Sequence, residues 1–376
     1  MIFNGGLYLH VPFCRQACHY CNFHFTTSLA HKESLIDALK REIAIRASLF
    51  DQAALQTIYF GGGSPSLLGA HELASILETI HRHFDTSRVR EITLEANPDD
   101  LSASYLQALK SIGIQRLSIG IQSFHEEDLR WMNRAHNAEQ ALNCIPQAQD
   151  AGFEDLSADL IFGYPLLTDE KYVYNLATLA QWNVPHISAY SLTVEEKTPL
   201  EKNIRKGLDR YPDNDAAASH FIQTSSYLTS LGYEHYEISN YALPGCHAIH
   251  NSNYWLGVEY LGAGPSAHSY YGGRRYWNVA NNQKYVRGIS SGIEISESET
   301  IDPVTAYNEL ILTRLRTKWG VQLSDIEKID PHYVIHFLNE IRPMIDQGFV
   351  EENSSCYRLT FNGKLLADYL TGQLFL

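Results

Sequence analysis

Short apolar runs alternate with amphipathic segments along the first half of the chain, up to about residue 192. The runs are rich in the β-branched and aromatic residues that favour strands, and they lie at 7–11, 57–60, 91–95, 116–122, 156–162 and 186–191. The segments between them have the pattern of surface helices, at about 31–49, 70–84, 102–112, 125–132, 138–151 and 169–182. Strand, helix and strand in this order form the repeating unit of a parallel α/β fold.

Polar and glycine residues gather where these predicted strands end. The first run is followed by three cysteines and the second by Gly61-Gly62-Gly63, while Glu95 and Gln122 end the third and fourth. In a (β/α) barrel the carboxyl ends of all strands meet at one mouth, whereas in an open sheet they spread along an edge. We therefore expect an α/β fold built on a partial (β/α)6 barrel that does not close to eight strands.

The alternation stops after residue 192. Residues 195–232 look helical and polar, and 233–285 are rich in Tyr, His and Gly. The last segment shows helical stretches, a probable hairpin near 350–360 and a terminal helix, an order that resembles a winged helix. We expect three domains: a barrel core at 1–235, an aromatic-rich α/β extension at 236–299 and a winged-helix-like cap at 300–376.

Composition and charge exclude several classes of protein. The chain is 44% apolar and 19% charged, which is typical of a folded domain rather than a disordered one. The net charge of −14 argues against nucleic-acid binding, which depends on Lys and Arg. No window approaches the roughly 18 consecutive apolar residues of a membrane helix, and the first residues lack the pattern of a secretory signal. We expect a cytoplasmic protein without an integral membrane segment.

Cys14, Cys18 and Cys21 form a C-x3-C-x2-C arrangement directly after the first predicted strand. Three thiolates on one short loop can surround an iron–sulfur centre, and with three cysteines one iron of a cubane stays open to another ligand. A Cys3His zinc site is the alternative, although no second pair of cysteines with knuckle spacing follows. The fourth zinc ligand would be His10, His19 or His24. Three inert cysteines within eight residues are improbable.

The cysteine loop resembles that of radical S-adenosylmethionine (SAM) enzymes, and most of all that of the coproporphyrinogen III oxidase-like family. The resemblance begins at 8–21 (YLHVPFCRQACHYC). Further blocks follow at 61–66 (GGGSPS), 95–98 (EANP), 118–124 (SIGIQSF), 133–136 (NRAH), 159–165 (DLIFGYP) and 250–255 (HNSNYW). Because the blocks keep their order over most of the chain, they are far more specific than any single motif.

This resemblance implies a [4Fe-4S] cluster held by Cys14, Cys18 and Cys21, with SAM on the fourth iron and an electron donor for the cluster. By position in the blocks, the SAM-contacting residues would be Tyr8, Tyr20, Gly62, Gly63, Ser64, Glu95, Gln122, Arg134 and Asp159. Glycine backbone after a strand can pair with the methionyl end of SAM, and Glu95 can accept from its hydroxyls or amine. Taken alone, the glycines would be a plain turn and Glu95 a capping or salt-bridging acid.

Residues 233–285 hold nine of the 23 tyrosines, together with two tryptophans and four histidines. Flat rings and imidazoles suit a large planar ligand, with His as a possible axial iron ligand. The alternative is an aromatic interface that packs the extension onto the barrel. The block at 250–255 resembles the HemW branch of the family, whose members are haem chaperones, and it implies haem binding and delivery to an acceptor protein. The candidate haem-binding residues are His250, Tyr254 and Trp255.

Position 23 also distinguishes the branches of the family. The oxidase carries a cysteine two positions after the third cluster cysteine, whereas this chain has Phe23 there, which points to the chaperone branch. Two departures from the family pattern are Ser64 in place of the usual Thr and Pro265 in a run of small residues, where it removes a backbone donor. The leading hypothesis is a haem chaperone with cluster and SAM. The alternatives are an oxygen-independent coproporphyrinogen III oxidase and, from another class, a zinc-stabilised protein-binding module. Whether the chain is an enzyme stays open.

Overall fold

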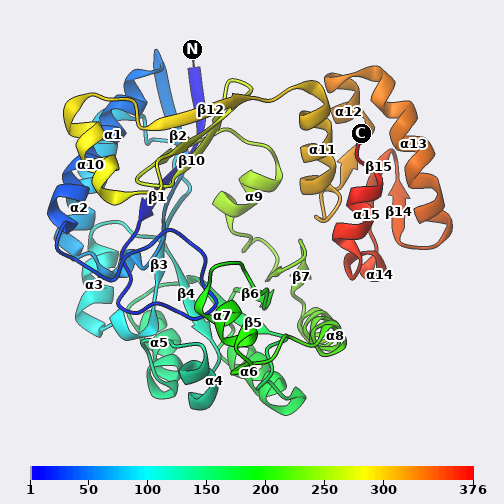
Figure 1. Ribbon diagram of the computed structural model, residues 1–376, viewed down its shortest axis with the longest axis horizontal. Helices are drawn as coiled ribbons and strands as arrows, with labels where there is room; N and C mark the ends of the chain where they lie inside the picture. The colour runs from blue at the N-terminus through cyan, green and yellow to red at the C-terminus, as the bar shows by residue number, and fades with distance from the viewer. Residues whose placement is uncertain (1) are drawn as a thin grey trace.

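The computed structural model describes residues 2–376, and within them a 12-stranded sheet forms the centre of the molecule (Figure 1). Its strand order is β12-β11-β10-β9-β1-β2-β3-β4-β5-β6-β8-β7. Strands β1 to β6 are parallel and neighbour one another in chain order. On their outer sides β1 pairs with β9 and β6 with β8, so the barrel stays open. The predicted partial (β/α)6 barrel is confirmed.

Each predicted apolar run lies within one parallel strand. The strands are β1 (Ile2–Val11), β2 (Gln52–Gly62), β3 (Glu91–Ala96), β4 (Arg116–Gln122), β5 (Asp155–Phe162) and β6 (His186–Ser191). All seven residues of β4 are buried, as expected for a strand covered on both faces.

Helices between these strands cover the outside of the sheet (Figure 1). They are α1 (Lys32–Ser48), α2 (Ala70–His83), α3 (Ala103–Ser111), α4 (Glu126–Trp131), α5 (Ala138–Asp150) and α6 (Asp169–Gln181), with short 3-10 turns η1 (Pro65–Leu67) and η2 (Pro98–Asp100). Side-chain caps begin several of them: Ser102, Asn137 and Thr168 each accept a hydrogen bond from the backbone N–H three residues later. The predicted helical segments agree with these bounds to within one or two residues.

The segment after β6 completes both edges of the sheet. It forms α7 (Pro199–Arg205), α8 (Asn214–Ser230), β7 (Glu234–His235), β8 (Asn240–Ala242), α9 (Ile249–Trp255), β9 (Tyr260–Ala263), β10 (His268–Tyr271), β11 (Arg274–Asn278), α10 (Asn282–Ser291) and β12 (Ser296–Thr300). Helix α9 connects β8, which lies beside β6, to β9, which lies beside β1, and it lies between the sheet and the C-terminal helices (Figure 1). The aromatic-rich stretch is therefore part of the main sheet rather than a separate layer.

The C-terminal residues pack around their own apolar core, which contains Tyr307, Ile311, Phe337 and Ile341. Their elements are α11 (Pro303–Arg314), β13 (Val321–Gln322), α12 (Leu323–Ile329), α13 (Pro331–Asp346), β14 (Val350–Asn353), β15 (Cys356–Leu359), α14 (Phe361–Lys364) and α15 (Ala367–Gln373), with a separate sheet of order β13-β15-β14. The winged-helix assignment and the domain boundaries at 235 and 299 stay predictions. No helix within residues 2–376 has the length and apolar composition needed to cross a bilayer.

Candidate functional site

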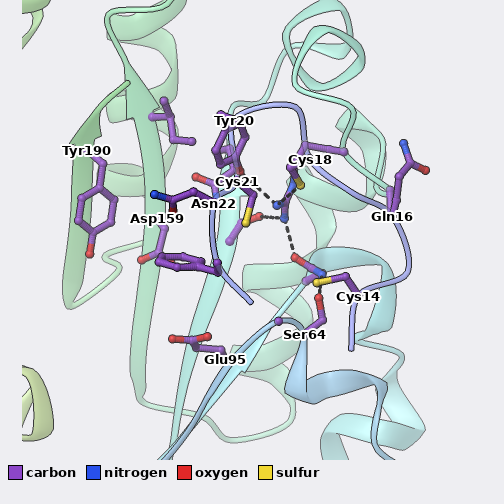
Figure 2. Close-up of a pocket in the computed structure, with 18 of the residues that line it drawn as sticks. Cys14, Gln16, Cys18, Tyr20, Cys21, Asn22, Ser64, Glu95, Asp159 and Tyr190 are labelled. Atoms are coloured by element: carbon purple, nitrogen blue, oxygen red, sulfur yellow. Dashed lines mark hydrogen bonds between the residues drawn. The ribbon is translucent and has the colours of Figure 1, made fainter. Parts of the chain in front are cut away.

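A cavity of about 400 Å³ lies at the carboxyl ends of the parallel strands, and Figure 2 shows side chains from several strands turned toward it. This volume is in the range of small-molecule sites. Most residues predicted to bind the cluster or SAM line it: Cys14, Cys18, Tyr20, Cys21, Gly62, Gly63, Ser64, Glu95, Gln122, Arg134 and Asp159. The fold brings them together because parallel strands place their carboxyl ends at one mouth.

The three cysteines approach the cavity from the loop after β1. Backbone hydrogen bonds hold this loop: the N–H of Cys14 donates to Thr26 O at 3.0 Å and that of Cys21 donates to Cys18 O at 3.3 Å. Burial raises the pKa of the Cys14 thiol to about 12 and also raises the pKa of Cys21. Thiolates rather than thiols are metal ligands, so binding a metal here would release protons.

Figure 2 shows Cys14, Cys18 and Cys21 on one side of the cavity, across from Asp159 and Tyr190. Within residues 2–376, no group of three His, Cys, Asp or Glu side chains could hold a single metal ion. The donor set offered to the cavity is thus three separate thiols. In a polynuclear iron–sulfur cluster each cysteine sulfur binds a different iron, and this chemistry fits the residues present.

The glycine loop after β2 packs directly against the cysteine loop. The N–H of Gly63 donates to Val11 O at 2.9 Å, and that of Ser64 donates to Phe13 O. A Cβ on Gly63 would lie 2.6 Å from Phe13 O and 3.0 Å from Cys14 Sγ, so no side chain fits there. Gly62 has a φ of +110°, which favours glycine. Both positions therefore require glycine to keep the two loops in contact.

Arg134 links the cysteine loop to the ends of β3 and β4. Its Nη2 donates to Asn97 Oδ1 at 2.5 Å and to Gly120 O at 2.8 Å, while Nη1 lies 3.3 Å from both Cys18 Sγ and the Tyr20 hydroxyl. Its buried Nε has no hydrogen-bond partner among the described residues. Arg134 thus ties the cysteine loop to the strand ends and places a guanidinium beside Cys18.

Two carboxyl groups, Glu95 and Asp159, face the opposite side of the cavity (Figure 2). Burial raises the pKa of Glu95 to about 7, with the Asp159 charge adding to the shift, and burial raises the pKa of Asp159 to about 6. Glu95 accepts hydrogen bonds from the Tyr59 hydroxyl at 2.8 Å and from the N–H of Gly62 at 3.1 Å. These carboxyls can hold or release a proton near neutral pH, and a cationic ligand would favour their ionised forms.

A second cavity of about 490 Å³ adjoins the first and shares Glu95 and Tyr190 with it. Its wall is rich in aromatic rings and also contains polar residues of the C-terminal half. The lining residues are Tyr8, Tyr59, Glu95, Tyr190, Glu237, Ile238, Ser239, Asn240, Asn251, Tyr254, Trp255 and Arg316.

Tyr8 was expected beside SAM, but it lines this second cavity and not the first. The reason is its place in β1, three residues before the strand ends, which puts its side chain deeper in the barrel than the cysteine loop. Tyr254 and Trp255, both expected near haem, also line the second cavity.

His250, the third haem candidate, lies outside this wall and is only 1% exposed. Its Nδ1 is 2.7 Å from Thr57 Oγ1, its Nε2 is 2.9 Å from the Tyr254 hydroxyl, and its ring stacks on Tyr59 at 4.9 Å. Burial lowers its pKa to about 3, so the ring is neutral. The bond from Nδ1 joins α9 to Thr57 of β2, whereas the bond from Nε2 to Tyr254 lies within α9, so both ring nitrogens have partners in this structure. These contacts favour an anchoring role for His250 over the predicted ligand role.

Sequence reasoning missed the roles of Tyr59 and Asn97. Tyr59 bonds to Glu95 and lines the second cavity, while Asn97 donates to Ser64 Oγ at 2.6 Å and accepts from Arg134. The period of two along a strand could have indicated Tyr59, since it shares a face with Gly61 at the strand end. The same period of two could have indicated Asn97, since it follows Glu95 by two positions.

Comparison with known proteins agrees with this geometry. Residues 8–177 match the model of the radical SAM superfamily, and residues 301–366 match that of the HemN C-terminal domain. The chain is 31% identical to the haem chaperone HemW of Mycobacterium tuberculosis, over 96% of this chain and 93% of that protein. It is 33% identical to the haem chaperone HemW of Bacillus subtilis, over 97% of each.

A solved structure extends the comparison to the fold. The coproporphyrinogen III oxidase HemN of Escherichia coli, a radical SAM enzyme, superimposes with a TM-score of 0.86 at 23% identity. The match covers 100% of this chain and 90% of that one, so it includes the C-terminal elements as well as the barrel.

Proposed function

This chain belongs to the radical SAM superfamily and, within it, to the family of the haem chaperone HemW, and from this membership we propose that it is a haem chaperone carrying a [4Fe-4S] cluster and SAM. Cys14, Cys18 and Cys21 would hold the cluster, and the cluster together with SAM would supply one-electron chemistry. An electron donor, a haem-acceptor protein and a cytoplasmic location complete the proposal.

The protein's own residues have separate tasks around the first cavity. Arg134 keeps a positive charge beside Cys18 and fixes the cysteine loop to the barrel. The Gly62 and Gly63 backbone keeps the space next to the cluster free of side chains. Glu95 and Asp159 provide acceptors for the cationic and hydroxyl groups of SAM. Tyr20, Ser64 and Gln122 complete the wall.

The observation that carries the haem proposal is the aromatic second cavity, which shares a wall with the first. Tyr254 and Trp255 offer flat apolar surface against which a planar macrocycle stacks. Arg316 supplies a guanidinium suited to a propionate carboxylate. Tyr8, assigned to SAM from its block, is assigned to this compartment because it lines this cavity.

Two other functions have less support. The oxidase shares the fold, but a likeness at 23% identity shows the fold alone, and Phe23 stands where that enzyme family places a further cysteine. The zinc module would need an imidazole near the three thiols. His10 is engaged by the Tyr8 hydroxyl and His24 O, His19 by Trp131 O, and His24 by Asn282.

Haem titration of the anaerobically reconstituted protein tests the proposal, with Trp255→Ala as the main variant. Trp255 lines the second cavity, whereas Trp277 of β11 lies outside both cavities and makes Trp277→Ala the matched control. Loss of one buried aromatic anchor costs about 2 kcal/mol, so we expect haem affinity to fall by roughly 30-fold in Trp255→Ala and to stay unchanged in the control. Equal haem affinity in both variants would place haem elsewhere and contradict the proposal.

A further inference from the structure

A third cavity of about 490 Å³ lies between α8 of the main body and the C-terminal elements β15 and α14. It shares no lining residue with the cluster cavity or the aromatic cavity. Its lining is basic and rich in hydroxyls, and consists of Ser225, Ser226, Thr229, His235, Thr317, Lys318, Glu351, Arg358, Leu359, Thr360, Phe361 and Lys364. This composition is unexpected in a chain whose net charge is −14.

Most of the charges around this cavity are paired. Lys318 donates to Glu234 Oε2 at 2.5 Å, and Arg358 forms an ion pair with Glu351. Lys364 differs, because no carboxylate forms an ion pair with it within the described residues. Its Nζ donates instead to the carbonyl oxygen of His235 at 2.7 Å. Two carboxylates, Glu237 and Glu351, act on the charge of Lys364, but neither forms an ion pair with it within the described residues.

The surroundings of Lys364 disfavour its protonated, positively charged form. Its side chain is half-buried, and burial lowers its pKa to about 8, with the Arg358 charge acting in the same direction and Glu237 and Glu351 against it. An ammonium group has three donors, and a single carbonyl does not replace the water it loses. An anion in the cavity would supply acceptors to Lys364 and offset the repulsion from Arg358.

We propose that this cavity, the interdomain basic cleft, binds the phosphate group of a small soluble molecule. Lys364 and Arg358 bind its oxygens, and the Ser226 hydroxyl, which also lines the cleft, adds a neutral donor. A phosphate carries up to two negative charges at neutral pH and thus suits a cleft whose lining holds three basic side chains, Lys318, Arg358 and Lys364, and one carboxylate, Glu351. The cleft has more room than a bare phosphate needs, which leaves space for the rest of the ligand.

Such a ligand would contact both parts of the chain, because Ser226 lies on α8 and Lys364 on α14. Binding would add contacts between the main body and the C-terminal elements, and these are lost when either part unfolds. A ligand that binds only the folded state raises its stability. The site is independent of the cluster and of haem, so it can be tested whatever those sites bind.

Calorimetric titration of the full-length protein with pyrophosphate, at constant ionic strength, tests the site. Lys364→Gln is the main variant, and Lys328→Gln is the matched control because Lys328 is 74% exposed and pairs only with Asp325. A hydrogen bond to a charged group contributes about 1.5–3 kcal/mol, so we expect pyrophosphate affinity to fall by about 10-fold to 100-fold in Lys364→Gln and to stay unchanged in Lys328→Gln. Lys364→Arg keeps the charge and should keep binding.

A melting curve without ligand separates a binding role from a structural one. If the unpaired charge is destabilising, Lys364→Gln melts at the same temperature as the unaltered protein or higher, and pyrophosphate no longer raises it. Absence of pyrophosphate binding to the unaltered protein would overturn the proposal. Equal loss in both Gln variants, or binding only to vesicles of phosphatidylglycerol and not to pyrophosphate, would overturn it as well.

Discussion

Replacing His250 by Ala tests whether this residue anchors α9 or binds iron. The ring is 1% exposed and lies between Thr57 of β2, Tyr254 of α9 and the stacked ring of Tyr59. The first turn of α9 is also bonded to the barrel, since Glu91 of β3 accepts hydrogen bonds from the N–H groups of Ile249 and His250. The side chain of His250 thus adds a second link between the barrel and the helix that lines the aromatic cavity.

The expected cost follows from these contacts. Removing the ring leaves the hydroxyls of Thr57 and Tyr254 without their partner, at about 1–3 kcal/mol for each buried group. The space left by a buried ring adds a further loss, and we expect a total of at least about 3 kcal/mol. This is a large part of the roughly 5–15 kcal/mol that stabilises an ordinary domain.

Urea unfolding, followed by circular dichroism, measures this change. We expect a clearly lower midpoint for His250→Ala and an unchanged one for His332→Ala, whose side chain is 90% exposed. Any haem bound by the folded His250→Ala protein should keep the Soret position of the unaltered protein, because the imidazole is not an iron ligand. An unchanged urea midpoint combined with a shifted or lost Soret band would refute the anchoring role.

Further predictions concern the first cavity. Gly63→Val should reduce the iron content after reconstitution several-fold, because the added Cβ would lie 3.0 Å or less from atoms of the cysteine loop, while Gly372→Ala, with open space around it, should not. Glu95→Gln should remove a pH dependence of stability: the folded protein holds the Glu95 proton up to about pH 7 and the unfolded chain up to about 4.5. The unaltered protein should therefore lose stability relative to Glu95→Gln as pH rises through this window, and parallel curves would contradict the raised pKa. Arg134→Gln should move the cluster potential to more negative values in a redox titration, because it removes a positive charge 3.3 Å from Cys18 Sγ; an unchanged potential would count against this role.

The elements that local pattern controls could be predicted closely from the sequence. The run 116–122 coincides with β4 and the run 186–191 with β6, because each lies between two segments of helical pattern, as a strand of a parallel α/β fold does. The lining of the first cavity could be predicted equally well. Its residues come directly after strands, and parallel strands bring those positions to one mouth.

The second cavity depends on contacts that no local pattern shows. His250 looked like a free imidazole in an aromatic segment, but its partner Thr57 lies 193 positions earlier in the chain. Tyr8 shared a block with the cluster cysteines, yet its depth along β1 places it in the neighbouring cavity. The placement of α9 against the sheet decides the case of His250, and it depends on packing between segments far apart in sequence.

One experiment tests the central claim most directly. The anaerobically reconstituted protein is supplied with SAM, a reductant, haem and coproporphyrinogen III, and both haem binding and porphyrin products are followed. For a haem chaperone we expect a Soret band from bound haem, transfer of that haem to an apo-acceptor, and no protoporphyrinogen IX. Conversion of coproporphyrinogen III by the purified protein, without haem binding, would contradict the assignment as a haem chaperone.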